Sequence, residues 1–568
     1  MTTITLTIDG KEVKGGQGDT ILEVCKRNGI DVPTLCHFDG LAERGLCRMC
    51  LVEAKGERGF VPACTTEARD GMEVTTENEK LTALRRANLE LLFSEKNHFC
   101  MFCEMSGDCE LQNLAYRYGM DHVRYDYSWP KLPVDATRKY FLFDQNRCIL
   151  CRRCIRACDE LAGHGVLGLK DRGPKTLVCA DLDYPFGEST CVSCGTCLQV
   201  CPTGALVDKR SAYLGREIHF DRTKSACTFC SVGCGIEILT RDGLPVRVEG
   251  DWEAEPNRGI LCVAGRFEPL YETRKRIKHP TAWRGSSLVE VSWEEALSLT
   301  AEAIKGVGGP SAVTGIISPR ATNEAASAFK RLFDENAHST TPPKTTAGDG
   351  KLSDIEEGDW IFIAGADLDE EFRVVSSFVK RAVNRGAKAA VLGSAGERVD
   401  KKAAKILAED DVAGLEKLIA ESERPVFVWG PATHPTVVKY LQGLKNKVKQ
   451  IGLAAGSNSR GLEKAGINPL CESSTREALY LLIADDVISC EIEERARKAK
   501  TLIIQSSYVN EIAERADVIF PSPPWFERSG TYTNTEGRLC RLNRACEPPK
   551  GALSDEEIVD AVRRRLLR

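Results

Sequence analysis

The pattern of apolar and polar residues predicts a small α+β domain at the start of the chain. Residues 4–8 alternate between apolar and polar side chains, and the Asp-Gly pair at 9–10 is a two-residue turn typical of a β-hairpin. A short helix follows, which Asp19 or Thr20 can cap and Gly29 ends.

Helical periodicity replaces this alternation after residue 78, where residues 79–97 read as an amphipathic helix. Its apolar face carries Leu81, Leu84, Leu91 and Leu92, whereas Arg85, Arg86 and Glu90 lie elsewhere. Residues 110–118 predict a shorter helix, and the aromatic-rich residues 120–142 read as a connector.

From about residue 276 onward the pattern becomes that of an α/β domain. Apolar runs read as strands, at 360–364, 425–429, 502–504 and 518–520. Residues 371–385 and 475–484 read as helices, and residues 344–350 and 521–524 as loops. Strands alternating with helices predict a mainly parallel sheet.

Composition narrows the class of protein. A chain of 568 residues should form several domains, and a net charge of −5 gives no basic footprint for nucleic acid. No apolar run approaches the length of a membrane span, and the first residues lack the features of a signal peptide. Twenty-five cysteines without such a signal favour metal binding in a reducing, cytoplasmic compartment over disulfides.

Fifteen of these cysteines stand in four spaced groups between residues 98 and 262. The groups are His98, Cys100, Cys103 and Cys109; Cys148, Cys151, Cys154 and Cys158; Cys191, Cys194, Cys197 and Cys201; and Cys227, Cys230, Cys234 and Cys262. The second and third groups both read C-x2-C-x2-C-x3-C, and the third ends in Cys-Pro, which is the bacterial ferredoxin pattern for two 4Fe-4S clusters.

In that pattern the last cysteine of each run binds the cluster of the other run. We therefore assign Cys201 to the cluster of Cys148, Cys151 and Cys154, and Cys158 to the cluster of Cys191, Cys194 and Cys197. Structural zinc also uses C-x2-C pairs and is the alternative, but it needs four ligands split between two knuckles, which two complete runs do not resemble.

The N-terminal domain carries a set of its own, Cys36, Cys47, Cys50 and Cys64, on a ferredoxin-like loop that predicts a 2Fe-2S cluster. Gly40 and Gly45 let the backbone bend around the sulfur atoms. Cys25 falls on the short helix and reads as a buried thiol.

His98 stands two residues before a cysteine, in a group that otherwise lacks a fourth ligand. We therefore predict it to be a cluster ligand. An imidazole in place of a thiolate removes negative charge from the centre and should raise its reduction potential.

The remaining candidates carry less chemistry. The glycines at 163–168 match G-x-G-x-x-G, but they follow a helical turn and no strand, so a nucleotide site is not predicted. Cys179 reads as a packed thiol in a strand. The spacing of the last four cysteines assigns them no role: Cys471, Cys490, Cys540 and Cys546.

The order of these motifs resembles the large iron–sulfur subunit of respiratory complex I and the related subunits of soluble NAD-linked hydrogenases and formate dehydrogenases. The resemblance covers essentially the whole chain, including the sequence SGTYTNTEG at 529–537, and it is most specific over residues 36–262.

The resemblance implies a multidomain α+β and α/β fold. Its expected parts are a ferredoxin-like β-grasp 2Fe-2S domain at 1–78, a 4Fe-4S domain with one-histidine three-cysteine ligation and a connector at 79–142, a two-cluster 4Fe-4S ferredoxin domain at 143–212, a four-cysteine 4Fe-4S unit of molybdopterin-oxidoreductase type at 213–275, and a truncated, degenerate molybdopterin-oxidoreductase-like α/β domain at 276–568.

Departures from the family narrow the implied function. Both cubane runs are complete here, as in the soluble hydrogenases and formate dehydrogenases, whereas complex I proper keeps one. Molybdenum-containing relatives carry a lysine at the position of Ala264 and a cysteine or selenocysteine that binds the metal, and this chain has no cysteine between Cys262 and Cys471. We therefore expect one 2Fe-2S and four 4Fe-4S clusters, no molybdopterin and no catalytic residues.

The function that follows is an electron relay in a soluble, cytoplasmic NAD(P)-linked complex, most simply a hydrogenase, with electron bifurcation as a further option. The expected partners are a flavin subunit with FMN and NAD(P), a small 2Fe-2S subunit, hydrogenase or other catalytic subunits and, for bifurcation, ferredoxin. The alternatives are an electron-input subunit of a complex I-type NADH-quinone oxidoreductase, a formate dehydrogenase iron–sulfur subunit and, from a different class, a zinc-stapled scaffold.

Overall fold

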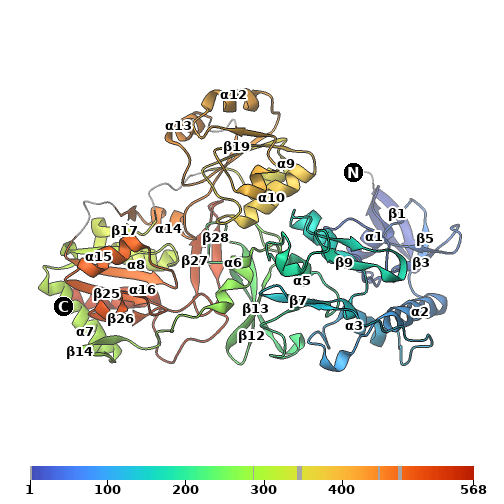
Figure 1. The fold of residues 1–568 in the computed structure, drawn as a ribbon, viewed down its shortest axis with the longest axis horizontal. Helices are drawn as coiled ribbons and strands as arrows, with labels where there is room; N and C mark the ends of the chain where they lie inside the picture. The colour runs from blue at the N-terminus through green and yellow to red at the C-terminus, as the bar shows by residue number, and fades with distance from the viewer. Residues whose placement is uncertain (1–2, 286, 342–347, 445–447, 471–475) are drawn as a thin grey trace. The chain divides into compact units, whose positions relative to one another are not determined.

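The computed structural model describes residues 3–285, 287–341, 348–444, 448–470 and 476–568. The chain forms two compact units, Met1–Phe220 and Asp221–Arg568. Figure 1 draws both as a ribbon that is coloured by residue number. Cys471 and most of the loop predicted at 344–350 lie outside the described residues. None of the helices within those ranges combines the length and apolar character that crossing a lipid bilayer requires.

The first unit begins with a five-stranded sheet in the order β2-β1-β5-β3-β4. Its strands are β1 (Thr3–Ile8), β2 (Lys11–Gly16), β3 (Leu51–Ala54), β4 (Phe60–Pro62) and β5 (Glu73–Thr75). Asp9 and Gly10 have φ values of 50° and 76°, so the predicted hairpin turn is confirmed. Thr20 is the residue that caps α1 (Ile21–Arg27), where it forms a capping box with Glu23.

The long helix α2 (Glu79–Glu95) confirms the predicted helix but not its predicted faces. Arg85 and Glu90 are buried, whereas Leu91 is 48% exposed. The Arg85 guanidinium donates to the backbone carbonyls of Met49, Leu51 and Thr76, and these bonds hold α2 against the N-terminal sheet. The predicted faces are wrong because a prediction from periodicity assigns every arginine to the exposed face of the helix. An arginine can nevertheless be buried when its guanidinium is hydrogen-bonded.

The rest of the first unit consists of short elements that connect cysteine loops. The helices are η1 (Cys100–Phe102), α3 (Glu110–Arg117), α4 (Arg153–Arg156), η3 (Ala157–Leu161) and α5 (Thr196–Gln199). The strands β6 (Val134–Asp135), β7 (Phe141–Asp144) and β10 (Leu206–Asp208) form one small sheet, and β8 (Leu167–Lys170) pairs with β9 (Leu177–Ala180). So little regular structure leaves the loop backbones free to surround the thiols.

The second unit opens with an antiparallel sheet of β11 (Asp221–Ala226), β12 (Gly235–Arg241) and β13 (Leu244–Gly250). A tight turn at Asp242 and Gly243 joins β12 to β13. Helix α6 (Val263–Arg266) follows directly after Cys262. A hairpin from near the end of the chain, β27 (Gly530–Thr533) and β28 (Leu539–Leu542), packs against β11.

An eight-stranded sheet forms the first α/β layer of this unit, in the order β15-β14-β26-β25-β24-β16-β17-β23. Its strands are β14 (Thr281–Arg284), β15 (Ser287–Glu290), β16 (Val313–Ile317), β17 (Ala337–Ser339), β23 (Asn468–Pro469), β24 (Ala478–Ala484), β25 (Thr501–Ser506) and β26 (Val518–Pro521). Helices α7 (Trp293–Gly306), α8 (Asn323–Phe333) and α16 (Asp555–Leu566) share one apolar core with this sheet, whereas α15 (Cys490–Lys498) packs into another.

The helix predicted over residues 475–484 is wrong over its described part, because residues 478–484 form the central strand β24, whereas residue 475 lies outside the described residues. All seven of its residues are buried, and it pairs with β16 and β25 in parallel. A strand covered on both faces reads as a continuous apolar run, so periodicity alone does not distinguish it from a buried helix.

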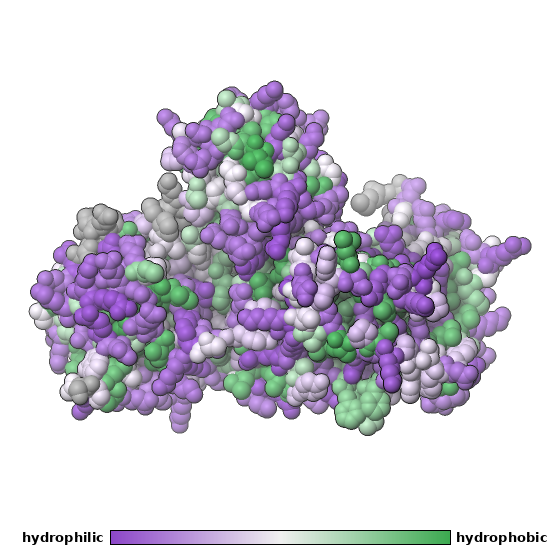
Figure 2. Space-filling model, in the orientation of Figure 1, coloured by the Kyte–Doolittle hydropathy of each residue, from purple (hydrophilic) through white to green (hydrophobic). Residues whose placement is uncertain are grey.

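A second, five-stranded parallel sheet has the order β20-β19-β18-β21-β22. Its strands are β18 (Trp360–Ala364), β19 (Lys388–Leu392), β20 (Lys405–Leu407), β21 (Pro425–Trp429) and β22 (Lys449–Gly452). In Figure 1, α9 (Leu352–Glu357) and α10 (Arg373–Asn384) lie on one side of this sheet, and α12 (Val412–Ala420) and α13 (Pro435–Gly443) on the other. The predicted α/β class and the parallel pairing of its strands are confirmed. The face of the molecule drawn in Figure 2 is mainly polar.

Candidate metal centres

The four cysteines predicted to hold a two-iron centre come together beside the N-terminal sheet. The Sγ atoms of Cys50 and Cys64 lie 3.3 Å apart, and the Cys47 amide donates to the Cys36 Sγ at 3.5 Å. The two pairs are close enough that the Cys36 charge acts on both Cys50 and Cys64. Cys36, Cys50 and Cys64 are buried, so water has little access to this set.

The hydrogen bond within each pair favours one thiolate at the expense of its partner, because it raises the pKa of Cys47 and Cys64 while it lowers that of Cys36 and Cys50. The Cys47 thiol lowers the pKa of Cys36 to about 6, and the charge of Arg156 adds to the lowering. Cys64 likewise lowers the pKa of Cys50 to about 7. Because thiolates bind iron and thiols do not, the geometry suits a metal centre.

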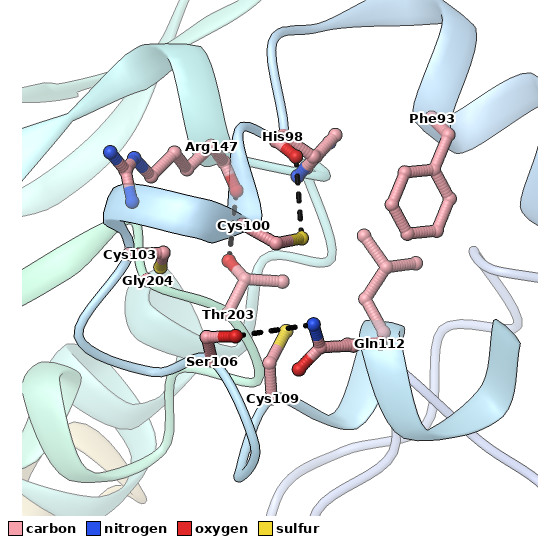
Figure 3. Close-up of a pocket in the computed structure, with 11 residues that line it drawn as sticks. Phe93, His98, Cys100, Cys103, Ser106, Cys109, Gln112, Arg147, Thr203 and Gly204 are labelled. Carbon is pink, nitrogen blue, oxygen red and sulfur yellow. Dashed lines mark hydrogen bonds between the residues drawn. The ribbon is translucent and has the colours of Figure 1, made fainter. Parts of the chain in front are cut away.

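His98, Cys100, Cys103 and Cys109 line one small pocket, which Figure 3 shows in close-up. Cys100 lies on η1, and Cys109 directly precedes α3, whose first amides donate to the Cys109 sulfur. Gly204 completes the wall, since a Cβ at this position would lie 2.4 Å from the Cys103 Sγ. The structure therefore brings the predicted histidine and all three cysteines to one place.

The His98 ring is arranged as metal-binding histidines are. Its Nε2 is buried without a hydrogen-bond partner, which leaves Nδ1 for the bond to the Leu92 carbonyl. Burial, assisted by Lys96 and Arg147, lowers the pKa of His98 to about 4, so the ring is neutral at pH 7. A neutral imidazole that donates from one nitrogen and offers the other fits a bound cluster.

The two C-x2-C-x2-C runs exchange their last cysteines in the structure. Burial raises the pKa of Cys151, and the nearby Cys201 and Cys148 raise it further. Burial also raises the pKa of Cys158, to about 12, and the nearby thiols that add to this shift belong to Cys194 and Cys191. Cys201 thus stands with the first run and Cys158 with the second, which is the predicted pairing.

The two runs repeat one backbone conformation. Leu150 and Ser193 have φ values of 52° and 56°, and each donates its amide to the sulfur two residues earlier at 3.4 Å. Two residues later in each run, Arg152 and Gly195 also have a left-handed backbone conformation, and they directly precede α4 and α5. Non-glycine residues adopt this conformation rarely, so its repetition at matching positions indicates loops built around a common group.

The fourth set, Cys227, Cys230, Cys234 and Cys262, lines a cavity of about 330 Å³ in the second unit. The Cys227 amide donates to the Cys234 carbonyl at 2.8 Å, and the Cys262 sulfur accepts from the amides of Gly265 and Ala264. Ala264 lines the same cavity and brings no charge to it.

Arginines face several of these sets, and sequence reasoning did not single them out. Arg147 bonds to the Cys103 thiol, and Arg373 interacts with Cys262. The Arg320 guanidinium lies 4.4 Å from the centre of the Phe229 ring and acts on Cys227. Arg147 could have been suspected because it adjoins a cysteine run, whereas Arg320 and Arg373 are remote in sequence and carry no local signal.

Five other cysteines fall within the described residues, and one of them accompanies a predicted set. Cys25 is buried, Cys179 is only partly buried in β9, and Cys490 is exposed. Cys540 accompanies the fourth set, because it adds to the raised pKa of Cys234. Cys546 is buried near Phe526.

Two further features were tested by the structure. Gly163 and Gly165 follow η3 and Gly168 lies within β8, so these glycines lack the strand-to-helix setting of a nucleotide fingerprint. In the ranges that the structure describes, no three His, Cys, Asp or Glu side chains are placed to hold a single metal ion. A cluster distributes its ligands over separate iron atoms and does not require such convergence.

Family models cover most of the chain. A 2Fe-2S iron–sulfur cluster binding domain matches residues 1–79, the NADH-ubiquinone oxidoreductase-G iron–sulfur binding region matches 85–124, and a 4Fe-4S dicluster domain matches 147–205. The molybdopterin oxidoreductase Fe4S4 domain matches residues 220–271. The molybdopterin oxidoreductase family matches 276–426 and 415–565.

Curated relatives match over nearly the whole chain. An NADH-quinone oxidoreductase subunit of Rhizobium meliloti is 28% identical, over 99% of this chain and 80% of its own. The NADPH-Fe(3+) oxidoreductase subunit alpha of Geobacter sulfurreducens is 27% identical, over 99% and 81%. Among solved structures, an NAD+-reducing [NiFe]-hydrogenase is 35% identical, over 38% of this chain and 91% of that one, with a TM-score of 0.36.

Two-iron and four-iron domains that precede a molybdopterin-type α/β domain define an iron–sulfur, electron-transfer class of oxidoreductase subunit. The chain belongs to the molybdopterin oxidoreductase family, and it is similar to the large iron–sulfur subunits of NADH-quinone oxidoreductases.

Proposed function

We propose that the chain relays single electrons in an NAD(P)-linked oxidoreductase complex through one 2Fe-2S and four 4Fe-4S clusters. Nineteen cysteines and His98 hold them. The sets are Cys36, Cys47, Cys50 and Cys64; His98, Cys100, Cys103 and Cys109; Cys148, Cys151, Cys154 and Cys201; Cys191, Cys194, Cys197 and Cys158; and Cys227, Cys230, Cys234 and Cys262. Their placement in five separate groups supports the proposal.

Iron–sulfur clusters, when bound, accept and release one electron each. The chain supplies the ligands and excludes water, since the Sγ-bearing loops are largely buried. Amides such as those of Leu150 and Ser193 donate to sulfur, and hydrogen bonds and nearby charge are the protein's means of setting each reduction potential.

We further propose that the α/β domain does not bind molybdopterin. Ala264 stands where molybdenum-containing relatives carry a lysine, and it faces the cavity beside the fourth set. The charged lining of the same cavity consists of the carboxylates Glu268, Glu370 and Glu371 and the guanidinium groups of Arg320 and Arg373, so it carries no excess of positive charge for the phosphate of a pterin cofactor. Molybdenum or tungsten in the purified chain would contradict this part of the proposal.

The terminal partner that we favour is a hydrogenase in a cytoplasmic complex, where electron bifurcation would add ferredoxin as a partner. The observation that supports this choice is the complete second cubane run, whose Cys191, Cys194 and Cys197 meet Cys158. The flavin, the NAD(P) site and a small 2Fe-2S subunit would belong to partner chains.

The decisive experiment is anaerobic purification of the native complex through a tag on this chain. We expect a flavoprotein and hydrogenase subunits to co-purify, and hydrogen to reduce NAD(P)+, alone or together with ferredoxin. Co-purification of membrane proton-pumping subunits would instead establish the complex I-type alternative. Formate-dependent NAD(P)+ reduction would establish the formate dehydrogenase alternative.

A further inference from the structure

Arg156 occupies an unusual position between two of the proposed centres. It ends α4 within the first run, is only 5% exposed, and makes its hydrogen bonds to backbone carbonyls. Its Nη1 donates to the Ala42 carbonyl at 2.5 Å. Its Nη2 donates to the carbonyl of Cys36, in the two-iron set, and to that of Cys151, in the first cubane set, at 3.5 Å.

The surrounding contacts show that the two loops are packed together at this residue. The Ala42 amide donates to Glu160 on η3 at 2.7 Å. A Cβ at Gly40 would lie 3.5 Å from the Leu161 side chain, so the loop of the two-iron set rests on the helical segment that carries Cys154 and Cys158. All of these residues belong to one compact unit.

The charge of Arg156 differs from that of its neighbour on the same helix. Arg153 is neutralised by Glu110, with two N–O distances of 2.5 and 2.8 Å. The guanidinium of Arg156 instead donates to the backbone carbonyls of Arg152, Ala42, Cys36 and Cys151, and none of these hydrogen bonds within the described residues reaches a carboxylate. A buried cation that no carboxylate neutralises favours any nearby group that becomes more negative, and a cluster does so when it is reduced.

We propose that Arg156 couples the two-iron centre to the first four-iron centre. Its guanidinium ties the ligand loops of both to one rigid group, and its charge stabilises the reduced form of each. The inference rests on the ligand sets of the proposed function. One electron lost by one centre is gained by the other, and no bond is made or broken, so the residue acts by positioning and by charge.

The experiment compares Arg156→Gln and Arg156→Lys with the parent in the full-length chain, purified anaerobically. Arg58→Gln is the matched control, because Arg58 is an exposed arginine of the same N-terminal domain. Iron content, EPR-monitored redox titration of the two-iron signal, and relaxation of that signal by the four-iron centre are measured.

For Arg156→Gln we expect at least a tenfold lower ratio of reduced to oxidised two-iron centre at a fixed potential, which corresponds to about 59 mV for one electron. The relaxation enhancement should weaken as well. Arg156→Lys should restore most of the ratio of reduced to oxidised centre, because lysine keeps the positive charge. It should not restore the relaxation enhancement, because an ammonium group lacks the planar guanidinium that bonds to two carbonyls at once. Arg58→Gln should match the parent.

Full iron content with an unchanged ratio and unchanged relaxation in Arg156→Gln would overturn the proposal. If that variant loses iron, Arg156→Lys decides: a parental ratio with weaker relaxation supports the coupling role, and parental values of both overturn it. Absence of the two-iron or four-iron signal from the parent chain would refute the ligand assignment itself, which is a separate failure.

Discussion

The free Nε2 of His98 is the residue-scale feature that most directly requires a bound group. A buried ring nitrogen without a partner loses its hydrogen bonds to water, and a metal bond at that atom would compensate. The Phe93 ring packs edge-on against the His98 ring, with 5.3 Å between the ring centroids, and the bond to the Leu92 carbonyl fixes the orientation of the His98 ring. The chain therefore holds the ring where it can bind iron.

Replacing His98 with cysteine should keep the centre but lower its reduction potential, because a thiolate adds negative charge. We expect the ratio of reduced to oxidised centre at a fixed potential to fall about tenfold. This corresponds to a reduction potential that is lower by about 59 mV for one electron. EPR-monitored titration measures it, with His122→Cys at an exposed histidine as the control. An unchanged potential with full iron content would show that His98 is not a ligand.

Gly204→Ala tests the packing around Cys103. The new Cβ would lie 2.4 Å from the Cys103 Sγ, so the thiol or the loop must move. We expect the loss of one four-iron centre, about four irons per chain. Gly168→Ala is the control, since nothing lies within 4 Å of its Cβ position. Parental iron content in Gly204→Ala would contradict the pocket.

The spacing of the cysteines predicted five sets of residues whose members the structure brings close together, and their role as cluster ligands remains a prediction. It did not predict the residues around them. Arg320 and Arg373 reach the fourth set from distant segments, and Gly204 matters only through its approach to Cys103. Such contacts depend on tertiary packing, which leaves no periodic or spacing signal.

At the scale of elements, the cysteine loops depend on scaffolds that are mostly packed from apolar residues. The parallel sheets and the N-terminal hairpin followed from strand patterns, which period-two alternation and short apolar runs reveal well, whereas the rest of the N-terminal sheet was expected from the family resemblance. The strand β24 did not, because its run of Ala and Leu suits a helix locally and only burial on both faces makes it a strand.

This correction can be checked with Leu482→Ala in β24. Leu482 is fully buried in the core that β24 shares with α8 and α16, so its truncation should cost about 2–5 kcal/mol of unfolding free energy. Leu539→Ala, at a leucine that is 70% exposed, should cost less than about 0.5 kcal/mol. Denaturant unfolding compares the two, and equal, small losses would contradict a central position for β24.

At the scale of the whole molecule, the chain carries many thiols and little that could do bond chemistry. Most of the sets lie in buried loops, whereas the segment that carries Cys100 and Cys103 exposes Met101 and Phe102, and amides and arginines contact several of the sulfur atoms. The α/β domain keeps a cavity beside the fourth set, and Ala264 gives it no cation. These features suit a subunit that conducts electrons between active sites on other chains.

The central claim is that the chain holds five iron–sulfur centres, and metal analysis combined with EPR of the anaerobically purified, dithionite-reduced chain tests it most directly. We predict about eighteen irons per chain, no stoichiometric zinc, and signals from one two-iron and four four-iron centres. A colourless chain that contains zinc in place of iron and gives no reducible signal would contradict it.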